Sequence, residues 1–246
     1  MQLDVSLNEI LDNFDNSGTV FIAGNRNIIK LFDYKNTTVN IKAFKVPQFI
    51  NKIIYKYFRE SKAKRSFNYA TMLLEKGINT PKPIAFHEEF SWIGLEKSYY
   101  SSEHLQYDLM FRDLVENENY LDSENIIKQF TAFCFKLHQK GVEFLDHSPG
   151  NTLIKKINEN TYSFYLVDLN RMNFHNEMSF ESRMKNLSRL TSKKKMVEQI
   201  AMEYSKISGE NEIVVFDTLW RYTSQFQYKY YRKKRLKKVF KFWEEN

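Results

Sequence analysis

The sequence predicts an α+β chain of two lobes, with a small antiparallel sheet in the N-terminal lobe and a mainly helical C-terminal lobe. Three short β-prone segments separated by tight turns open the chain, and two more follow after a helical stretch. From about residue 104 onward, apolar residues recur at helical spacing around one short hairpin. The pattern therefore predicts an N-lobe of residues 1–103 and a C-lobe of residues 104–246.

The N-lobe elements follow from local composition. Its strands are rich in β-branched and aromatic residues and are expected at Thr19–Ala23, Asn27–Phe32, Thr38–Phe44, Ile84–His87 and Lys97–Glu103. Helical spacing between the third and fourth strands predicts helices over Val46–Arg65 and Ala63–Lys76, which Gly77 would end.

The C-lobe is expected to be helical except around one hairpin. Apolar residues at helical spacing predict helices at Leu109–Leu114 and Asn125–Gln139. The hairpin strands are expected at Thr152–Lys156 and Ser163–Val167. After Asp168 the pattern is helical to the end of the chain.

Composition excludes several classes of protein. The 246 residues are 42% hydrophobic and 27% charged, which excludes disorder as the main state. The single cysteine, Cys134, excludes a disulfide framework and a cysteine-based zinc site. There is no apolar run near the ~20 residues of a membrane-spanning helix and no secretory signal pattern. We therefore expect a cytoplasmic protein.

The net charge of +7 is unevenly distributed. Residues 42–65 carry +7 and residues 226–246 carry +6, so the rest of the chain is acidic. Such basic segments suit polyphosphate, an anionic membrane or nucleic acid, and they also occur as ordinary solvated helix faces.

The segment Val142–Asn170 contains the most informative spacing. Asp146 is followed five residues later by Asn151, and a β-prone run then ends in Asp168. Phosphoryl transfer from ATP needs a carboxylate at the acceptor hydroxyl, and an amide oxygen and a second carboxylate on magnesium. A D-x-x-x-x-N loop, a hairpin and a strand ending in Asp predict that these groups meet at one cleft.

Upstream residues extend this pattern. Lys42 lies on the third predicted strand, where a kinase places the lysine that pairs with ATP. Gly24, Arg26 and Asn27 join the first two strands, where a phosphate loop is expected, although a single glycine is a weak loop signal.

With these residues the chain resembles the protein kinase-like fold, and more closely the lipopolysaccharide kinase family of bacterial Kdo/heptose kinases. The stretches that carry the resemblance are Ser61–Phe67, Leu73–Pro81, Leu137–Gly141, Asp146–Asn151 and Leu166–Met172. The resemblance covers roughly residues 15–175.

The resemblance implies a role for each matching residue. Asp146 would be the catalytic base, and Asn151 and Asp168 would bind Mg²⁺. Lys42 would contact the α- and β-phosphates of ATP. The other expected contacts are adenine against the hinge backbone of Ser102, Glu103 and His104, nucleotide phosphate near Gly24 and Arg26, and phosphate at Arg171.

Some positions depart from the kinase pattern. Phe144 stands two residues before Asp146, where many kinases have histidine, and Asp168 is followed by Leu169 and Asn170 rather than Phe-Gly. The helix after strand three has its only glutamate late, at Glu75, so Asn68 or Glu60 are the alternative partners for Lys42.

The resemblance implies an ATP- and Mg²⁺-dependent kinase that phosphorylates a sugar hydroxyl of the lipopolysaccharide inner core, with Kdo on lipid A as the expected acceptor. About 75 residues follow Asp168, with no A-P-E motif, which argues against a protein substrate. Two alternatives remain open: a kinase for another small molecule, of the amino alcohol or aminoglycoside type, and a non-catalytic pseudokinase.

The basic segments bear on location. Residues 227–243 interleave Tyr, Phe and Trp with Lys and Arg, as interfacial helices on anionic lipid do. An enzyme acting on a Kdo-lipid A glycolipid must reach the inner face of the bacterial inner membrane, so we expect peripheral attachment there. No RNA-binding motif accompanies the basic residues, and nucleic acid is not an expected partner.

Overall fold

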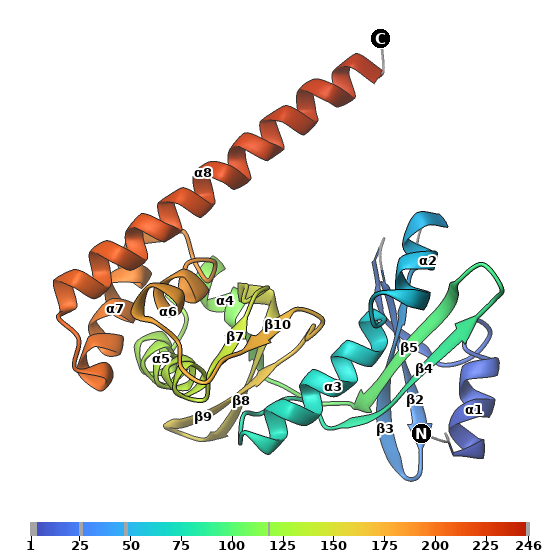
Figure 1. Ribbon diagram of the computed structural model, residues 1–246. Coiled ribbons are helices and arrows are strands. Elements are labelled where there is room, and N and C mark those ends of the chain that lie inside the picture. Colours follow the sequence, from blue (N-terminus) through green and yellow to red (C-terminus); the bar gives the residue numbers. More distant parts are fainter. Residues whose placement is uncertain (1–3, 25–26, 47–48, 118, 245–246) are drawn as a thin grey trace. The chain divides into compact units, whose positions relative to one another are not determined.

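The computed structural model describes residues 4–24, 27–46, 49–117 and 119–244. The chain forms two compact units, which are described separately below (Figure 1). The first unit comprises residues 1–106 together with 165–171. The second comprises residues 107–164 and 172–246.

The first unit is built on a five-stranded antiparallel sheet, as the sequence predicts. Its strands are β1 (Thr19–Ala23), β2 (Asn27–Tyr34), β3 (Thr37–Phe44), β4 (Pro83–Phe90) and β5 (Leu95–Glu103). The order across the sheet is β1-β2-β3-β5-β4. The hairpins β1–β2–β3 and β4–β5 therefore join through the pairing of β3 with β5.

The helices that accompany this sheet among the described residues are α1 (Val5–Asp12), α2 (Phe49–Tyr57) and α3 (Lys62–Glu75). Helix α1 lies outside the elements that the sequence pattern predicts. The single helix expected over Val46–Arg65 is wrong, because α2 ends at Tyr57 and a new helix begins at Lys62. The Ser61 hydroxyl accepts a hydrogen bond from the Lys64 amide at 3.0 Å, which caps this second start.

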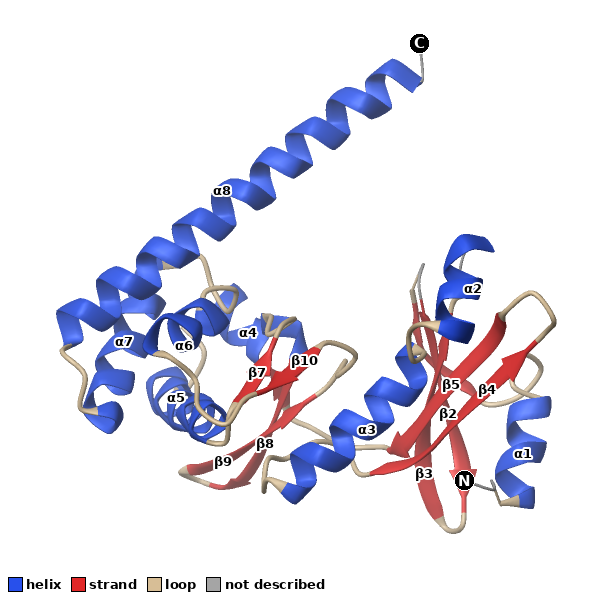
Figure 2. Ribbon diagram, in the orientation of Figure 1, coloured by secondary structure: helices blue, strands red, loops and turns tan. Residues whose placement is uncertain are grey.

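Alternation along β3 sorts its side chains onto the two faces of the sheet. Val39 and Ile41 are fully buried in a cluster with Leu7 and Leu11 of α1. Lys42 follows Ile41 in the strand and therefore faces the other way. Figure 2 shows α1 and α3 on different sides of this sheet.

A buried lysine fixes the segment after α1 to the sheet. Lys30 of β2 is 8% exposed, and its ammonium donates to the carbonyl oxygens of Phe14, Asp15 and Ser17 at 2.6, 3.0 and 3.0 Å. Three acceptors compensate the desolvation of this charge. The turn after α1 is thereby held against β2.

The second unit contains two small sheets. The first has the strands β6 (Leu109–Met110), β8 (Thr152–Asn158) and β9 (Thr161–Leu166), in the order β6-β8-β9. The second pairs β7 (Val142–Phe144) with β10 (Met172–Phe174), antiparallel. The last two residues of β9 belong to the first unit.

These sheets correct two sequence predictions. The chain after Asp168 is not helical throughout, because β10 forms before the next helix. The helix expected from Leu109 begins two residues later, since Leu109 and Met110 pair with Ile154 and Leu153 of β8. Strands of two or three residues have too few positions for a period to appear, and long-range pairing sets them.

The helices of the second unit enclose its core. They are α4 (Phe111–Glu116), α5 (Ser123–Gln139), α6 (Phe180–Leu187), α7 (Lys194–Ser208) and α8 (Glu212–Glu244), with a 3₁₀ turn at Pro149–Asn151. Phe111, Phe130 and Tyr204 are fully buried in this core. Within the described ranges, no helix is both long enough and apolar enough to cross a bilayer.

Gly141, between α5 and β7, is expected to tolerate no side chain. Its φ is +68°, and a Cβ there would lie 1.8 Å from the backbone oxygen of His175. Gly141→Ala is expected to lower the free energy of unfolding by more than about 3 kcal/mol in urea denaturation. Gly209→Ala is the matched control, because φ is +75° there but a Cβ would meet open space.

Gly209→Ala separates the cost of the positive φ from the cost of the steric clash with His175. The left-handed conformation alone costs a non-glycine residue about 1–2 kcal/mol, so Gly209→Ala should lose about that much. Equal losses at the two glycines would contradict the close approach of Gly141 to His175.

Candidate active site

The structure brings together two of the residues that the sequence singles out. Lys42, opposite Tyr100 in the register of β3 and β5, places its ammonium 2.5 Å from Oδ1 of Asp168. The Lys42 side chain is 12% exposed and that of Asp168 is 40% exposed. A cation from strand three and the carboxylate that follows β9 therefore form a half-buried ion pair in the first unit.

Asp168 has an unusual backbone and a second side-chain partner. Its φ is +60°, a left-handed conformation that Asp and Asn tolerate better than most residues. The Asn170 side-chain amide donates to Asp168 Oδ1 at 2.8 Å, and the Asn170 backbone amide donates to the Asp168 carbonyl at 3.0 Å. Asn170 has no expected role from the sequence, although the D-x-N spacing marks its closeness to Asp168.

Helix α3 supplies no carboxylate partner for Lys42 among the interactions of the described residues. Glu60 instead pairs with Lys64 at 3.0 Å and accepts from the Asn68 amide at 3.5 Å. Glu60 and Asn68, the alternative partners for Lys42 that the sequence offers, thus contact each other. The carboxylate that pairs with Lys42 is Asp168.

Asp146 and Asn151 form a closed loop in the second unit. The Asn151 side-chain nitrogen donates to the Asp146 carbonyl at 2.8 Å, and the Asn151 backbone amide donates to the Ser148 carbonyl at 2.9 Å. Pro149 begins the 3₁₀ turn that ends at Asn151. With its nitrogen bound to the loop, the Asn151 side chain presents its oxygen as the remaining polar atom.

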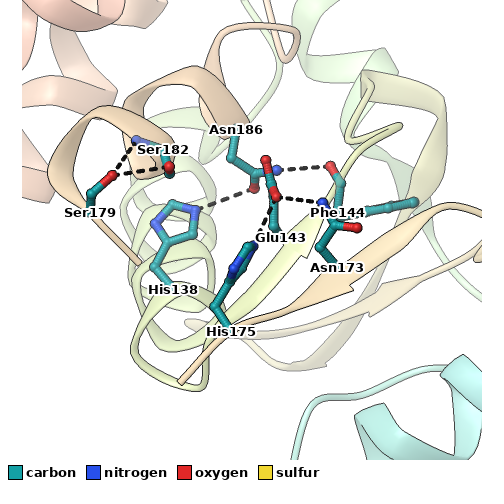
Figure 3. A network of polar contacts seen from close by, with 8 residues as sticks. All are labelled: His138, Glu143, Phe144, Asn173, His175, Ser179, Ser182 and Asn186. Atoms are coloured by element: carbon teal, nitrogen blue, oxygen red, sulfur yellow. Dashed lines mark hydrogen bonds and ion pairs between the residues drawn. The ribbon is translucent and has the colours of Figure 1, made fainter. Parts of the chain in front are cut away.

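The strand before this loop is held by α6. Asn186 donates to the Phe144 carbonyl at 2.8 Å and contacts His138 Nε2 at 3.3 Å (Figure 3). The same figure shows Glu143 pointing to Asn173 and His175 of the following segment. The two residues before Leu145 are therefore fixed by side chains from later in the sequence.

His147, next to Asp146, is completely buried. Its ring stacks on Phe144 with a centroid separation of 5.6 Å and meets the edge of Phe130 at 5.9 Å. Neither ring nitrogen has a hydrogen-bond partner within the described part of the chain. Burial lowers the pKa of His147 to about 4 and that of His138 to about 3.

These two histidines are expected to make the fold sensitive to acid. Both are neutral when folded, and below the ordinary histidine pKa of about 6.5 only the unfolded chain takes up their protons. Stability is therefore fully present above pH 6.5 and falls toward pH 4, by up to about 1.4 kcal/mol per pH unit for each histidine.

His147→Phe should reduce this loss of stability on acidification by about half, because phenylalanine cannot take up a proton in the unfolded chain and one of the two titrating groups is gone. The check is urea denaturation between pH 4.5 and 7.5, with pH 7.5 as the internal reference. An unchanged pH dependence in the variant would contradict the assignment.

The expected adenine-facing segment lies at the end of β5. Ser102 is buried, and the backbone amides of Glu103 and His104 donate to the carbonyls of Lys82 and Thr38, each at 2.9 Å. These two amides therefore complete the sheet. Burial lowers the pKa of the His104 imidazole, which lies edge-on to Phe21.

Of the remaining predicted contacts, Gly24 and Arg171 are exposed. Gly24 closes the β1–β2 turn, where its amide donates to the Asn27 carbonyl at 3.0 Å. Arg26 lies outside the described residues. Arg171 is exposed and follows Asn170 directly.

Carboxylate and amide oxygens are both donor types that bind Mg²⁺. In the first unit Asp168 offers a half-exposed carboxylate, and in the second unit Asn151 offers an amide oxygen. No group of three His, Cys, Asp or Glu residues that could hold a metal occurs in the portion of the chain that is described.

Residues 25–208 match the model of the lipopolysaccharide kinase (Kdo/WaaP) family. The chain belongs to this family. A search of curated proteins found no match.

A solved structure described as WaaP in complex with acyl carrier protein is similar to this family member, with a TM-score of 0.60. The match covers 88% of this chain and 92% of that one at 13% identity, so it establishes the fold. The kinase-like α+β fold predicted from the sequence is confirmed. The family consists of lipopolysaccharide kinases, which are phosphotransferases that use ATP.

Proposed function

We propose that this lipopolysaccharide kinase transfers the γ-phosphate of ATP to a hydroxyl of Kdo in the lipid A-linked inner core. The observation that carries the proposal is the contact between Lys42 and Asp168, two residues 126 positions apart that kinase chemistry requires together. The family assignment supports the acceptor class, and the Asp146–Asn151 loop supports the reaction type.

In this proposal Asp146 accepts the proton of the acceptor hydroxyl. The hydroxyl oxygen forms a bond to the γ-phosphorus while the bond between that phosphorus and the β-γ bridging oxygen breaks, releasing ADP. Lys42 stabilises the charge that collects on the phosphates. Asn151 and Asp168 would hold Mg²⁺, which neutralises the phosphate oxygens when bound.

The nucleotide contacts are assigned to the first unit. The backbone of Ser102, Glu103 and His104 would receive adenine, with the Glu103 carbonyl as the acceptor for its amino group. Gly24 and Arg26 would border the phosphates, and Arg171 would contact phosphate.

We also assign the C-terminal end of α8 to an anionic membrane surface. Tyr228, Tyr230 and Tyr231 are each more than half exposed, and Arg232–Arg235 contributes four consecutive cations with no acid among them. Aromatic rings at headgroup depth and cations on acidic lipid are both favourable. This supports peripheral attachment at the inner face of the inner membrane.

Vesicle sedimentation tests this attachment. Replacing Lys233, Lys234 and Arg235 with serine is expected to weaken binding to phosphatidylglycerol vesicles about 100-fold, since each cation contributes about 1 kcal/mol. The matched control replaces the basic triplet 193–195 at the start of α7 and should bind as wild type does. Equal binding of both variants would contradict the assignment.

The function is tested by transfer of label from γ-labelled ATP and Mg²⁺ to lipid A precursor with and without Kdo. Label in the Kdo-bearing lipid only, absent with Asp146→Asn, is the expected result. Label in an amino alcohol or aminoglycoside instead would show that Kdo is not the acceptor. ATP binding without transfer to any of these acceptors would favour a pseudokinase.

A further inference from the structure

Arg189, just after α6, makes three contacts with one guanidinium group. Its Nη1 donates to the Leu145 carbonyl at 2.6 Å and lies 3.6 Å from Oδ1 of Asp146. The guanidinium carbon also lies 5.1 Å from the centroid of the Phe226 ring, on α8. All four residues belong to the second unit.

The shortest of these contacts is the hydrogen bond from Arg189 to the backbone carbonyl of Leu145. Because an arginine is always charged, this is a charge-assisted hydrogen bond to the peptide that leads directly into Asp146. Asn186 holds the preceding carbonyl, that of Phe144, at 2.8 Å. Two side chains three residues apart thus fix two consecutive peptides before the proposed base.

The contact with the Asp146 carboxylate is looser. At 3.6 Å it is an ion pair rather than a close hydrogen bond, and the Arg189 side chain is 39% exposed. This ion pair favours one orientation of the Asp146 carboxylate, and it holds that carboxylate less tightly than a short hydrogen bond would.

Phe226 limits where the guanidinium can lie. Arginine over an aromatic face is favourable, and the half-buried Phe226 ring provides a fixed surface for it. Phe226 immediately precedes the exposed basic segment of α8. Removing the ring would free the arginine to leave the loop.

We propose that Arg189 is a positioning residue for Asp146, and that Phe226 of α8 holds Arg189 in place. The proposal rests on the proposed function for the role of Asp146. It gives the C-terminal helix a part in the geometry of the catalytic loop that is separate from any attachment to lipid.

Steady-state kinetics with four variants tests the proposal. Arg189→Met is expected to lower kcat about 100-fold with little change in the KM for ATP, because a displaced catalytic group costs about that much. Arg189→Lys, which keeps one donor, should recover at least a tenth of the activity. Phe226→Ala should lower kcat, and adding it to Arg189→Met should cause no further loss.

Arg221→Met is the matched control. Arg221 also lies over an aromatic ring, that of Tyr222 at 4.9 Å, but it pairs with Glu181 away from the loop. Wild-type kcat in Arg189→Met would overturn the proposal. Losses that multiply in the double variant would overturn the role of Phe226.

Hydrogen exchange separates this proposal from the proposed function, because it needs no activity. Amide exchange across residues 144–151 is expected to be at least about tenfold faster in Arg189→Met and unchanged in Arg221→Met. If the wild-type protein transferred no phosphate but the two variants showed these exchange rates, the proposed function would be refuted and the contact between Arg189 and the loop would stand. Unchanged exchange in Arg189→Met would overturn the contact itself.

Discussion

Asp168→Asn is expected to lower kcat for phosphate transfer at least about 1000-fold while the protein remains folded. The substitution removes the negative charge that pairs with Lys42 at 2.5 Å and that we assign to Mg²⁺. Asparagine keeps an oxygen that can accept from Lys42 and Asn170, and it tolerates the left-handed φ of +60° at this position. Single-turnover transfer and thermal unfolding, measured on the same preparation, check both parts.

The choice of asparagine makes this result interpretable. Asp168→Ala would add backbone strain to the loss of charge, so its inactivity would be ambiguous. Lys42→Met is the companion variant, and it should also lose transfer because the phosphates lose their cation. Asp168→Asn that retained more than a tenth of wild-type kcat would contradict the assignment of Asp168.

Asp146→Asn is expected to lower kcat by about 100- to 10,000-fold, the range that general base catalysis contributes. The backbone contacts of the loop do not involve the carboxylate: Asn151 and Arg189 bond to the carbonyls of Asp146 and Leu145. The loop should therefore keep its shape, and the affinity for ATP should stay within about threefold of wild type. Isothermal titration with a non-hydrolysable ATP analogue, alongside transfer kinetics, measures both.

Asp217→Asn is the control for Asp146→Asn, because Asp217 is an exposed aspartate on α8. It should match wild type in both measurements. If Asp146→Asn lost ATP affinity in proportion to kcat, the carboxylate would serve nucleotide binding and not the acceptor proton.

The sequence pattern was enough to predict those elements that depend on interactions between residues close in the sequence. The strands of the first unit are five to nine residues long and rich in β-branched and aromatic residues, so their positions and the place of Lys42 on the third were predictable. The D-x-x-x-x-N spacing predicted the Asp146–Asn151 loop because one tight turn joins the two residues. The family resemblance, stated from these motifs, is confirmed.

Long-range contacts were not predictable in the same way. The β7–β10 pairing joins two three-residue strands separated by 27 residues, and no period appears in so few positions. Kinases place the carboxylate partner of this lysine on a helix, so the sequence pattern pointed to a helix residue. In this structure the partner of Lys42 is Asp168, which follows β9. Arg189 and Asn186 reach the loop from more than 40 positions away, and no motif spacing marks them.

The first unit is discontinuous in the sequence, since residues 165–171 complete it from beyond the hairpin of the second. The returning segment supplies the Leu166 carbonyl to the Thr80 hydroxyl at 2.8 Å and the Asp168 carboxylate to Lys42. A gene fragment that ends at residue 106 would therefore encode a sheet in which the buried Thr80 hydroxyl and the partly buried Lys42 ammonium lack these partners. Co-expression of separate halves, or exchange of whole lobes between relatives, should succeed only when the residues 165–171 come from the same parent as the sheet they complete.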